Sequence, residues 1–166
     1  MYTDPVIKKY LDLFKANTGG AIKTFIQGEP VKIATSNLPA LMISKRETRV
    51  ASFSNADDEY GIGMSITVIT DIRSDLSTTE ADDKIVKGVA HLYDLIEGRN
   101  DDYTLKNTSV LHILRSNIEV DTANNLRTEL GSITRVDYGF TLKERDPSTW
   151  SIEARIDFVA NFIQVR

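Results

Sequence analysis

Apolar and polar residues alternate between Tyr60 and Arg73, and this stretch carries the clearest strand pattern in the chain. A period of two is typical of a β-strand with one buried face. At about 3.3 Å per residue, a strand of this length crosses a small domain. We therefore expect it to be a central strand of a sheet. The apolar positions on its buried face are Ile62, Met64, Ile66, Val68 and Ile72.

The first helix is predicted to begin at Asp4-Pro5. Aspartate is a good N-cap, and proline suits the first helical position because its missing N–H would be unpaired there anyway. The predicted helix ends at Gly19-Gly20. Apolar residues fall at helical spacing on one face between these signals, at Val6, Ile7, Tyr10, Leu11 and Phe14.

A second, central helix follows the capping-box sequence Ser77 to Glu80 and ends near Gly98, where a C′ glycine is expected. We expect it to pack across one face of the sheet. Its apolar face comprises Ile85, Val86, Val89, Leu92, Tyr93 and Ile96.

Shorter extended segments lie between the two helices. Residues 22–33 read as extended chain with a turn at 28–30, and a second strand is expected from Ala40 to about Arg46. Residues 49–54 suggest a further short strand. The sequence Asn55 to Glu59 is predicted to be an acidic loop before the central strand.

The last part of the chain predicts a long β-hairpin. Residues 131–143 and 150–158 alternate in polarity, and the turn-forming residues Glu144 to Ser148 separate them. Residues 159–165 have apolar side chains at both odd-numbered and even-numbered positions, that is, on both faces of a strand. This pattern fits a strand that is buried on both sides, or one that a neighbouring subunit covers.

Residues 99–127 are mostly polar, with a single apolar run at Val110 to Leu114 that predicts a short helix or strand. No composition shift marks a second domain. The elements together predict one α+β domain over residues 1–166. We expect a mainly antiparallel sheet with a long C-terminal hairpin, flanked by an N-terminal and a central helix.

Composition narrows the class of protein. A chain of 166 residues buries about 70% of its unfolded surface, which suffices for a core without a disulfide or a metal. The chain has no cysteine, no basic and apolar leader, and no apolar run of about 20 residues. A net charge of −4 disfavours general nucleic-acid binding.

Few residues suggest catalysis or cofactor binding. Gly61 and Gly63 open a strand and lack the third glycine of a dinucleotide fingerprint, so they are better explained by close strand packing. His91 is expected in solvent, and His112 has no carboxylate near it in sequence. We predict no catalytic, cofactor-binding or metal-binding residues.

The acidic clusters lack the spacing of a calcium-binding loop. The pair Asp82-Asp83 lies in the first turn of a predicted helix, where negative charge is favourable. Asp57 to Glu59 and Asp101-Asp102 are expected at loop tips. Solvation or contacts with a partner of complementary charge explain them best.

The order of elements resembles the tail terminator (tail-completion) proteins of long-tailed bacteriophages, and in particular relatives of the lambda-type terminator. The resemblance rests on the opening helix, FIQGEPVKI, the proline-led strand LPALMIS, ADDEYGIGMSITVITDIR, the capped helix and the final hairpin. It covers most of the chain. The length and the polar segment 99–127 depart from the pattern.

The resemblance implies a structural, non-enzymatic virion protein without a cofactor. It implies a homo-oligomer, a hexameric ring at the head-proximal end of the tail tube, which stops tube polymerisation. The partners would be the tube protein and a neck, connector or head-completion protein, with DNA passing through the lumen. No membrane and no sequence-specific nucleic acid is implied, and assembly would take place in the host cytoplasm. The interface residues expected from composition are Asp57, Asp58, Glu59, Glu144, Arg145, Asp146, Val159, Phe162, Ile163 and Val165.

Three alternatives remain open at the level of sequence. A head-completion or neck adaptor protein would share the small α+β fold and ring symmetry. An enzyme or small-ligand domain would require the histidines and carboxylates to converge in a pocket. A monomeric interaction module would lack an exposed apolar patch at residues 159–165.

Overall fold

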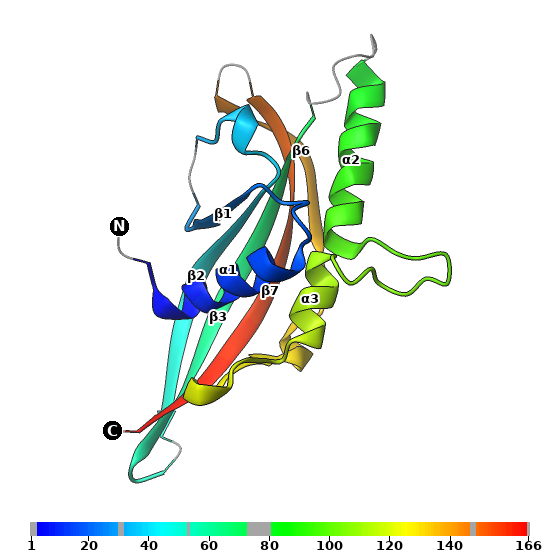
Figure 1. Cartoon of the computed structure of the whole chain (residues 1–166). Helices are drawn as coiled ribbons and strands as arrows, with labels where there is room; N and C mark the ends of the chain where they lie inside the picture. Colours follow the sequence, from blue (N-terminus) through cyan, green and yellow to red (C-terminus); the bar gives the residue numbers. More distant parts are fainter. Residues whose placement is uncertain (1–2, 30–31, 53, 73–80, 147–148, 166) are drawn as a thin grey trace.

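The computed structural model describes residues 3–29, 32–52, 54–72, 81–146 and 149–165 (Figure 1). Within these residues the chain forms three α-helices and seven strands, in an order that confirms the predicted α+β class. The helices are α1 (Pro5–Asn17), α2 (Ala81–Glu97) and α3 (Val110–Ser116). The strands are β1 (Thr24–Gln27), β2 (Ala40–Ser52), β3 (Asp57–Asp71), β4 (Glu119–Asp121), β5 (Leu126–Glu129), β6 (Asp137–Asp146) and β7 (Thr149–Val165).

The strands form one curled, mostly antiparallel sheet in the order β1-β2-β3-β7-β5-β4, and β6 also pairs with β7. Only the pairing of β1 with β2 is parallel among the named strands of the described residues. Strand β7 pairs with β3 from Asp71↔Ser151 to Asp57↔Val165. Its other edge is shared, because β6 pairs with its first half and β5 with residues 159–161. The predicted C-terminal hairpin is thus confirmed.

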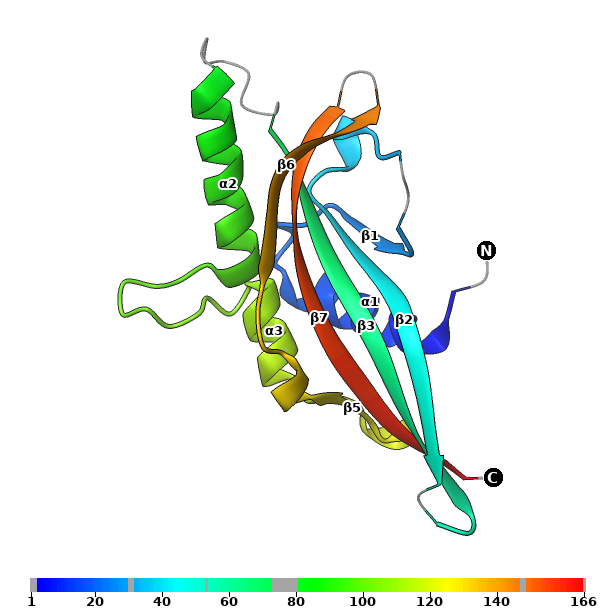
Figure 2. The same ribbon diagram turned by 180° about the vertical axis from the view of Figure 1, so that it is seen from behind.

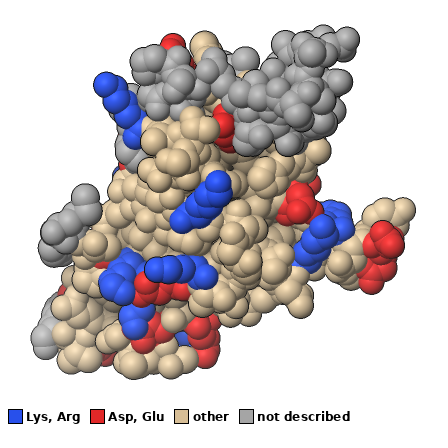
Figure 3. Space-filling view, turned by 45° about the horizontal axis from the view of Figure 1, so that its top comes forward, with Lys and Arg blue, Asp and Glu red and all other residues tan. Residues whose placement is uncertain are grey.

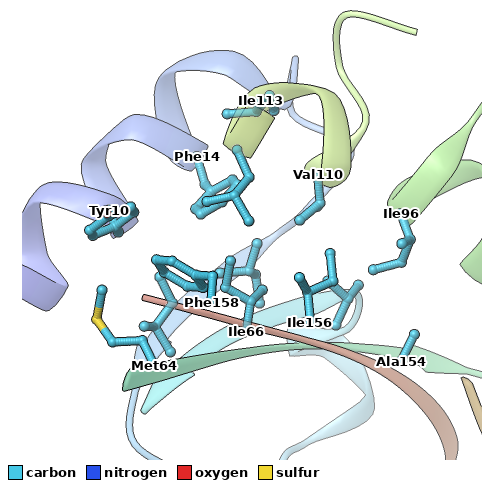
Figure 4. Packing of buried hydrophobic residues seen from close by; sticks show 14 of the residues in the cluster. Tyr10, Phe14, Met64, Ile66, Ile96, Val110, Ile113, Ala154, Ile156 and Phe158 are labelled. Atoms are coloured by element: carbon cyan, nitrogen blue, oxygen red, sulfur yellow. The ribbon is translucent and has the colours of Figure 1, made fainter. Parts of the chain in front are cut away.

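The three helices lie on one face of the sheet and enclose the main core with it (Figures 1 and 2). In the close-up, Tyr10 and Phe14 of α1 lie over Phe158 and Ile66 of the sheet (Figure 4). Tyr10 also meets Phe158 ring to ring, with centroids 5.0 Å apart. The alternating apolar positions of β3 and β7 therefore point toward the helices, as the period of two predicted.

A smaller cluster covers the opposite face at the β1 end of the sheet. Ile33 and Leu38, from the segment before β2, pack there against Ala40, Met42 and Ile69. This contact explains why β2 begins with four buried residues in succession. Both faces of the sheet are covered at this point, which is typical of a continuous apolar run.

The ends of α1 and α2 follow from local chemistry. The Asp4 carboxylate accepts hydrogen bonds from the amides of Val6 and Ile7 at 3.0 and 3.2 Å, so the predicted N-cap is confirmed. The predicted capping box at 77–80 lies outside the described residues. Gly98 follows α2 as predicted, but it is not among the glycines with positive φ. Glycine is favoured there because a Cβ atom would lie 2.5 Å from the carbonyl oxygen of Asp94.

Three sequence predictions about strand limits were wrong. Strand β2 continues to Ser52, so residues 49–52 of the suggested separate strand belong to β2, and Asp57 to Glu59 belong to β3 rather than to a loop. Likewise, Glu144, Arg145 and Asp146 belong to β6 and not to a turn. In each case backbone pairing with a neighbouring strand extends a segment whose polar side chains carry no strand signal.

The segment 99–127 contains one predicted element and two that the sequence did not indicate. The run at Val110 is the helix α3, whose first turn is capped by the Ser109 hydroxyl. Strands β4 and β5 are short, and three of their seven residues are exposed. Gly28 has a φ of +91°, in keeping with the turn predicted there, although residues 30–31 lie outside the described residues.

Candidate interaction surface

The main candidate surface is an arm at one end of the sheet, which we define as β2 residues 45–52, β3 residues 57–63 and β7 residues 159–165. The arm continues past the helices toward the C-terminus (Figure 2). All eight β2 residues in it are exposed, whereas the first four residues of β2 are buried. Helices thus cover the body of the sheet, whereas the β2 side of the arm and the last three described residues of β7 are exposed.

Apolar side chains cross the arm on the face that the helices cover elsewhere. Val50, Tyr60 and Phe162 are register partners on three adjacent strands. The rings of Tyr60 and Phe162 stack with centroids 4.9 Å apart and an interplanar angle of 3°. Val50 is nevertheless 58% exposed. The row is a hydrophobic strip for which the described part of the chain provides only partial cover.

Seven of the ten predicted interface residues meet in the arm. Asp57 pairs with Val165 and Glu59 pairs with Ile163, so the acidic and apolar groups come together across β3 and β7. Ile163 and Val165 are 36% and 74% exposed. The interpretation of residues 159–165 as buried on both sides is therefore wrong. The predicted residues in the arm are Asp57, Asp58, Glu59, Val159, Phe162, Ile163 and Val165.

The other predicted group lies at the opposite end of the long strand β7. Glu144 pairs with Trp150 and Asp146 pairs with Thr149, beside the start of β7. This hairpin end and the arm lie at opposite ends of the molecule (Figure 1). The side chains of Arg145 and Asp146 are not among those that the structure describes. The two predicted groups do not form one site.

Both outer strands of the arm have open edges in the described part of the chain. Strand β1 pairs with β2 only at residues 40–43, and β5 pairs with β7 only at residues 159–161. Beyond these points, β2 residues 44–52 and β7 residues 162–165 pair with β3 alone. Open edges offer backbone N–H and C=O groups to a further strand.

A groove of about 570 Å³ lies beside the open edge of β7. Its walls are the first turn of α1, the turn at residues 121–126 and the end of β7. The Lys9 ammonium meets the Asp121 carboxylate at 2.9 Å on the rim. Hydrogen bonds from Asn124 and Lys9 hold the pKa of Asp121 below its usual value. The apolar lining includes Pro5, Val6, Ala123, Leu126, Phe162 and Val165.

Sequence reasoning missed one exposed residue, Tyr103. It lies at the tip of the segment that follows α2, beside Asp101 and Asp102, and it is 80% exposed. Its φ of +67° lies in the left-handed region. An aromatic residue within the polar run GRNDDYT was the available signal. The expectation that Asp101-Asp102 lies at a loop tip is confirmed.

The residues considered for chemistry are spread over the fold. His91 is exposed on α2, and the Nε2 atom of His112 lies 3.2 Å from the Ser116 hydroxyl. Gly61 and Gly63 lie within β3, where a Cβ atom on Gly63 would come within 2.9 Å of Glu47. The Glu47 side chain therefore lies close over this glycine. Among the described residues, no group of three or more His, Asp and Glu side chains is positioned to hold a metal ion.

Charged side chains of both signs are interleaved on the face seen in Figure 3 and do not separate into a basic and an acidic half. Within the described residues, none of the helices combines the length and apolar character needed to cross a bilayer. No protein-family model matches the chain, and no curated protein resembles it at a significant level.

Proposed function

We propose that this chain is a structural protein of a long-tailed bacteriophage virion that closes the head-proximal end of the tail tube as a hexameric ring. The observation that carries the proposal is the arm, with an open strand edge on each side and exposed apolar residues at its end. In a ring of identical subunits, two different surfaces of one copy meet. The arm offers two different edges of this kind.

The β2 edge of the arm carries mostly basic side chains. Strand β2 contributes Lys45, Arg46 and Arg49 to the arm and only one acidic residue, Glu47. Strand β3 begins with three acidic residues, which lie between the ends of β2 and β7. Charged groups of both signs in the arm would set the register of a contact between copies more than its affinity.

The remaining predicted contacts fit two further partners. The hairpin end at Glu144 and the arm lie at opposite ends of the molecule (Figure 1). A ring between a tube and a neck needs contacts on two opposite sides, one for the tube protein and one for the neck or head-completion protein. In this proposal the protein needs no cofactor and performs no catalysis, and DNA passes through the lumen.

Sedimentation at several protein concentrations, followed by negative-stain images with purified tail tubes, tests the proposal. We expect rings, or monomers that form rings at tube ends. A monomer that ignores tubes would contradict the terminator role. Binding to portal–adaptor complexes in place of tubes would instead identify a neck adaptor.

A pair of matched substitutions locates the contact in the arm. Ile163 in the arm and Leu130 outside it are both 36% exposed. We expect Ile163→Lys to abolish ring formation and Leu130→Lys to preserve it, while each changes the free energy of unfolding by less than about 1 kcal/mol. Equal loss of assembly in both variants would argue against the arm as the interface.

A further inference from the structure

We propose that the segment from Arg99 to Leu105, here called the knob, inserts Tyr103 into the groove of the next copy of the chain. The inference rests on the proposed ring and names the side-by-side contact within it. It assigns a role to Tyr103 and to the groove beside α1, whose lining includes the open end of β7 at residues 162–165. In this inference the knob occupies that end of β7 in place of a further strand.

The first observation is the conformation of Tyr103. A bulky residue with positive φ is strained, and glycine would occupy that backbone region at no steric cost. The side chain is 80% exposed, so its ring contributes little to the core. Because the fold gains little from a tyrosine that costs stability here, a contact outside the chain is the simplest reason for its presence.

Hydrogen bonds hold the knob in place without any contribution from the phenol ring of Tyr103. The Arg99 guanidinium donates to the carbonyl oxygen of Tyr103 at 2.8 Å, and the Asn100 amide donates to that of Thr104 at 2.9 Å. At its base, the Lys106 amide donates to the carbonyl oxygen of Gly98 at 2.7 Å. These bonds hold the backbone and leave the phenol ring pointing outward. A pre-organised aromatic group loses little entropy when it binds.

The second observation is the groove. Its volume of about 570 Å³ lies within the range of about 300–1,000 Å³ that encloses drug-sized molecules, so one phenol ring fits. Phe162, Leu126 and Val6 give it apolar walls against which a ring can pack. Lys9 and Asn124 also lie on its lining, where both donate to the carboxylate of Asp121 at 2.9 and 2.8 Å.

The polar groups of the lining bond to one another, so the apolar walls of the groove favour an aromatic group as its occupant. Asp101 and Asp102 precede Tyr103 and are exposed, so they would reach the rim of the groove when the ring enters. Lys9 is half exposed and already faces one carboxylate, that of Asp121. A second copy of this chain supplies such a group, because Tyr103 is exposed on a segment that projects away from the groove of its own chain.

The third observation is the position of the two parts. The knob projects from one side of the molecule, whereas the start of α1 and the end of β7 lie on the other, and both views agree (Figures 1 and 2). A contact between opposite sides is heterologous. It propagates from copy to copy and closes into a ring if the rotation between copies permits.

Two variants test the contact from its two sides. Tyr103→Ala removes the phenol group of the knob. Ala123→Trp places a large side chain at an exposed position of the groove lining and so fills the groove. We expect each variant alone to sediment as a monomer under conditions in which the unmodified chain forms rings. The matched control Ala16→Trp places the same side chain at an exposed position of α1 outside the groove lining and should still assemble.

Mixing the two variants gives the decisive result. The Ala123→Trp subunit keeps its knob and the Tyr103→Ala subunit keeps its groove, so one intact contact remains possible. We expect a one-to-one dimer that grows no further. Assembly of Tyr103→Ala like the unmodified chain would overturn the inference, and so would a mixture that stays monomeric.

Loss of folding is separated from loss of contact by a third variant. Tyr103→Gly relieves the positive φ, so we expect its Tm to exceed that of Tyr103→Ala by about 2–4 °C. Both should nevertheless fail to assemble. Rings that form through the knob but ignore tail tubes would contradict the proposed function and leave this inference intact. An unmodified chain that stays monomeric with and without tubes would overturn both.

Discussion

Asp4 links the start of α1 to the sheet. Its carboxylate caps the helix and also pairs with the Lys45 ammonium of β2. Partial burial opposes ionisation, but hydrogen bonds from Lys45 and from the amides of Ile7 and Val6 outweigh it and lower the pKa of Asp4 below 3.8. One residue thus holds two elements in place.

The depressed pKa gives Asp4 a defined pH dependence. A carboxyl with a lower pKa in the folded state stabilises the fold above its unfolded pKa, here 3.8, and this contribution is lost as the pH falls through the folded pKa. Asp4→Ala should cost about 1 kcal/mol at pH 7, and Asp4→Asn should cost less because asparagine can still cap. Urea unfolding from pH 7 to pH 2.5 checks this. A difference from the unmodified chain that stays constant over that range would contradict it.

At the scale of elements, a buried hydrogen bond joins α1 to β5. The hydroxyls of Tyr10 and Thr128 lie 2.8 Å apart, and the two residues are 0% and 2% exposed. Burial raises the pKa of Tyr10 above its usual value, so the group stays neutral. The contact holds the short strand β5 beneath helix α1.

A double-mutant cycle measures this contact. Tyr10→Phe and Thr128→Val should each cost about 1–3 kcal/mol, because each leaves a buried hydroxyl without its partner. The double variant should cost little more than either single one, since no unpaired hydroxyl remains. Chemical unfolding provides the free energies. Strictly additive costs would show that the two hydroxyls act independently.

The elements that sequence predicted were those with a buried face. Alternation identified the body of β3, and capping identified α1, because in both cases side-chain chemistry reports burial directly. The β2 side of the arm lacked a burial signal, since residues 45–52 are all exposed and backbone pairing with β3 joins them into one strand with the body of β2. The predicted interface residues in β3 and β7 could be named from composition. Their meeting across the two strands, and the exposure of Tyr103, depend on tertiary contacts that no local pattern encodes.

At the scale of the whole molecule, helix cover divides the sheet into a stable body and a less protected arm. Strand β3 runs through both parts and has β2 and β7 as neighbours throughout. Its burial changes along its length, from half-buried at Asp57 to Gly61 to buried from Met64 onward. Local opening should therefore begin in the arm.

Hydrogen exchange on the unassembled protein tests this division within a single strand. Amides at positions 58–61 should exchange at least about tenfold faster than those at 64–69, because the former lack the packing of the helices. The comparison is internal, since both groups pair with the same two strands. Uniform protection along β3 would show that the arm and the body open together.

The pairing of β3 with β7 has a consequence for the newly made chain. Strand β3 ends at Asp71, and its partner spans Thr149–Val165, so α2, α3 and β4 to β6 must leave the ribosome between them. At about 5–20 residues per second, β3 waits about 5–20 s for its partner. During that time one long edge of the β2–β3 hairpin is open to other chains. Completion of the sheet is therefore a late event in biosynthesis, and the concentration of nascent chains will govern how much protein folds and how much aggregates.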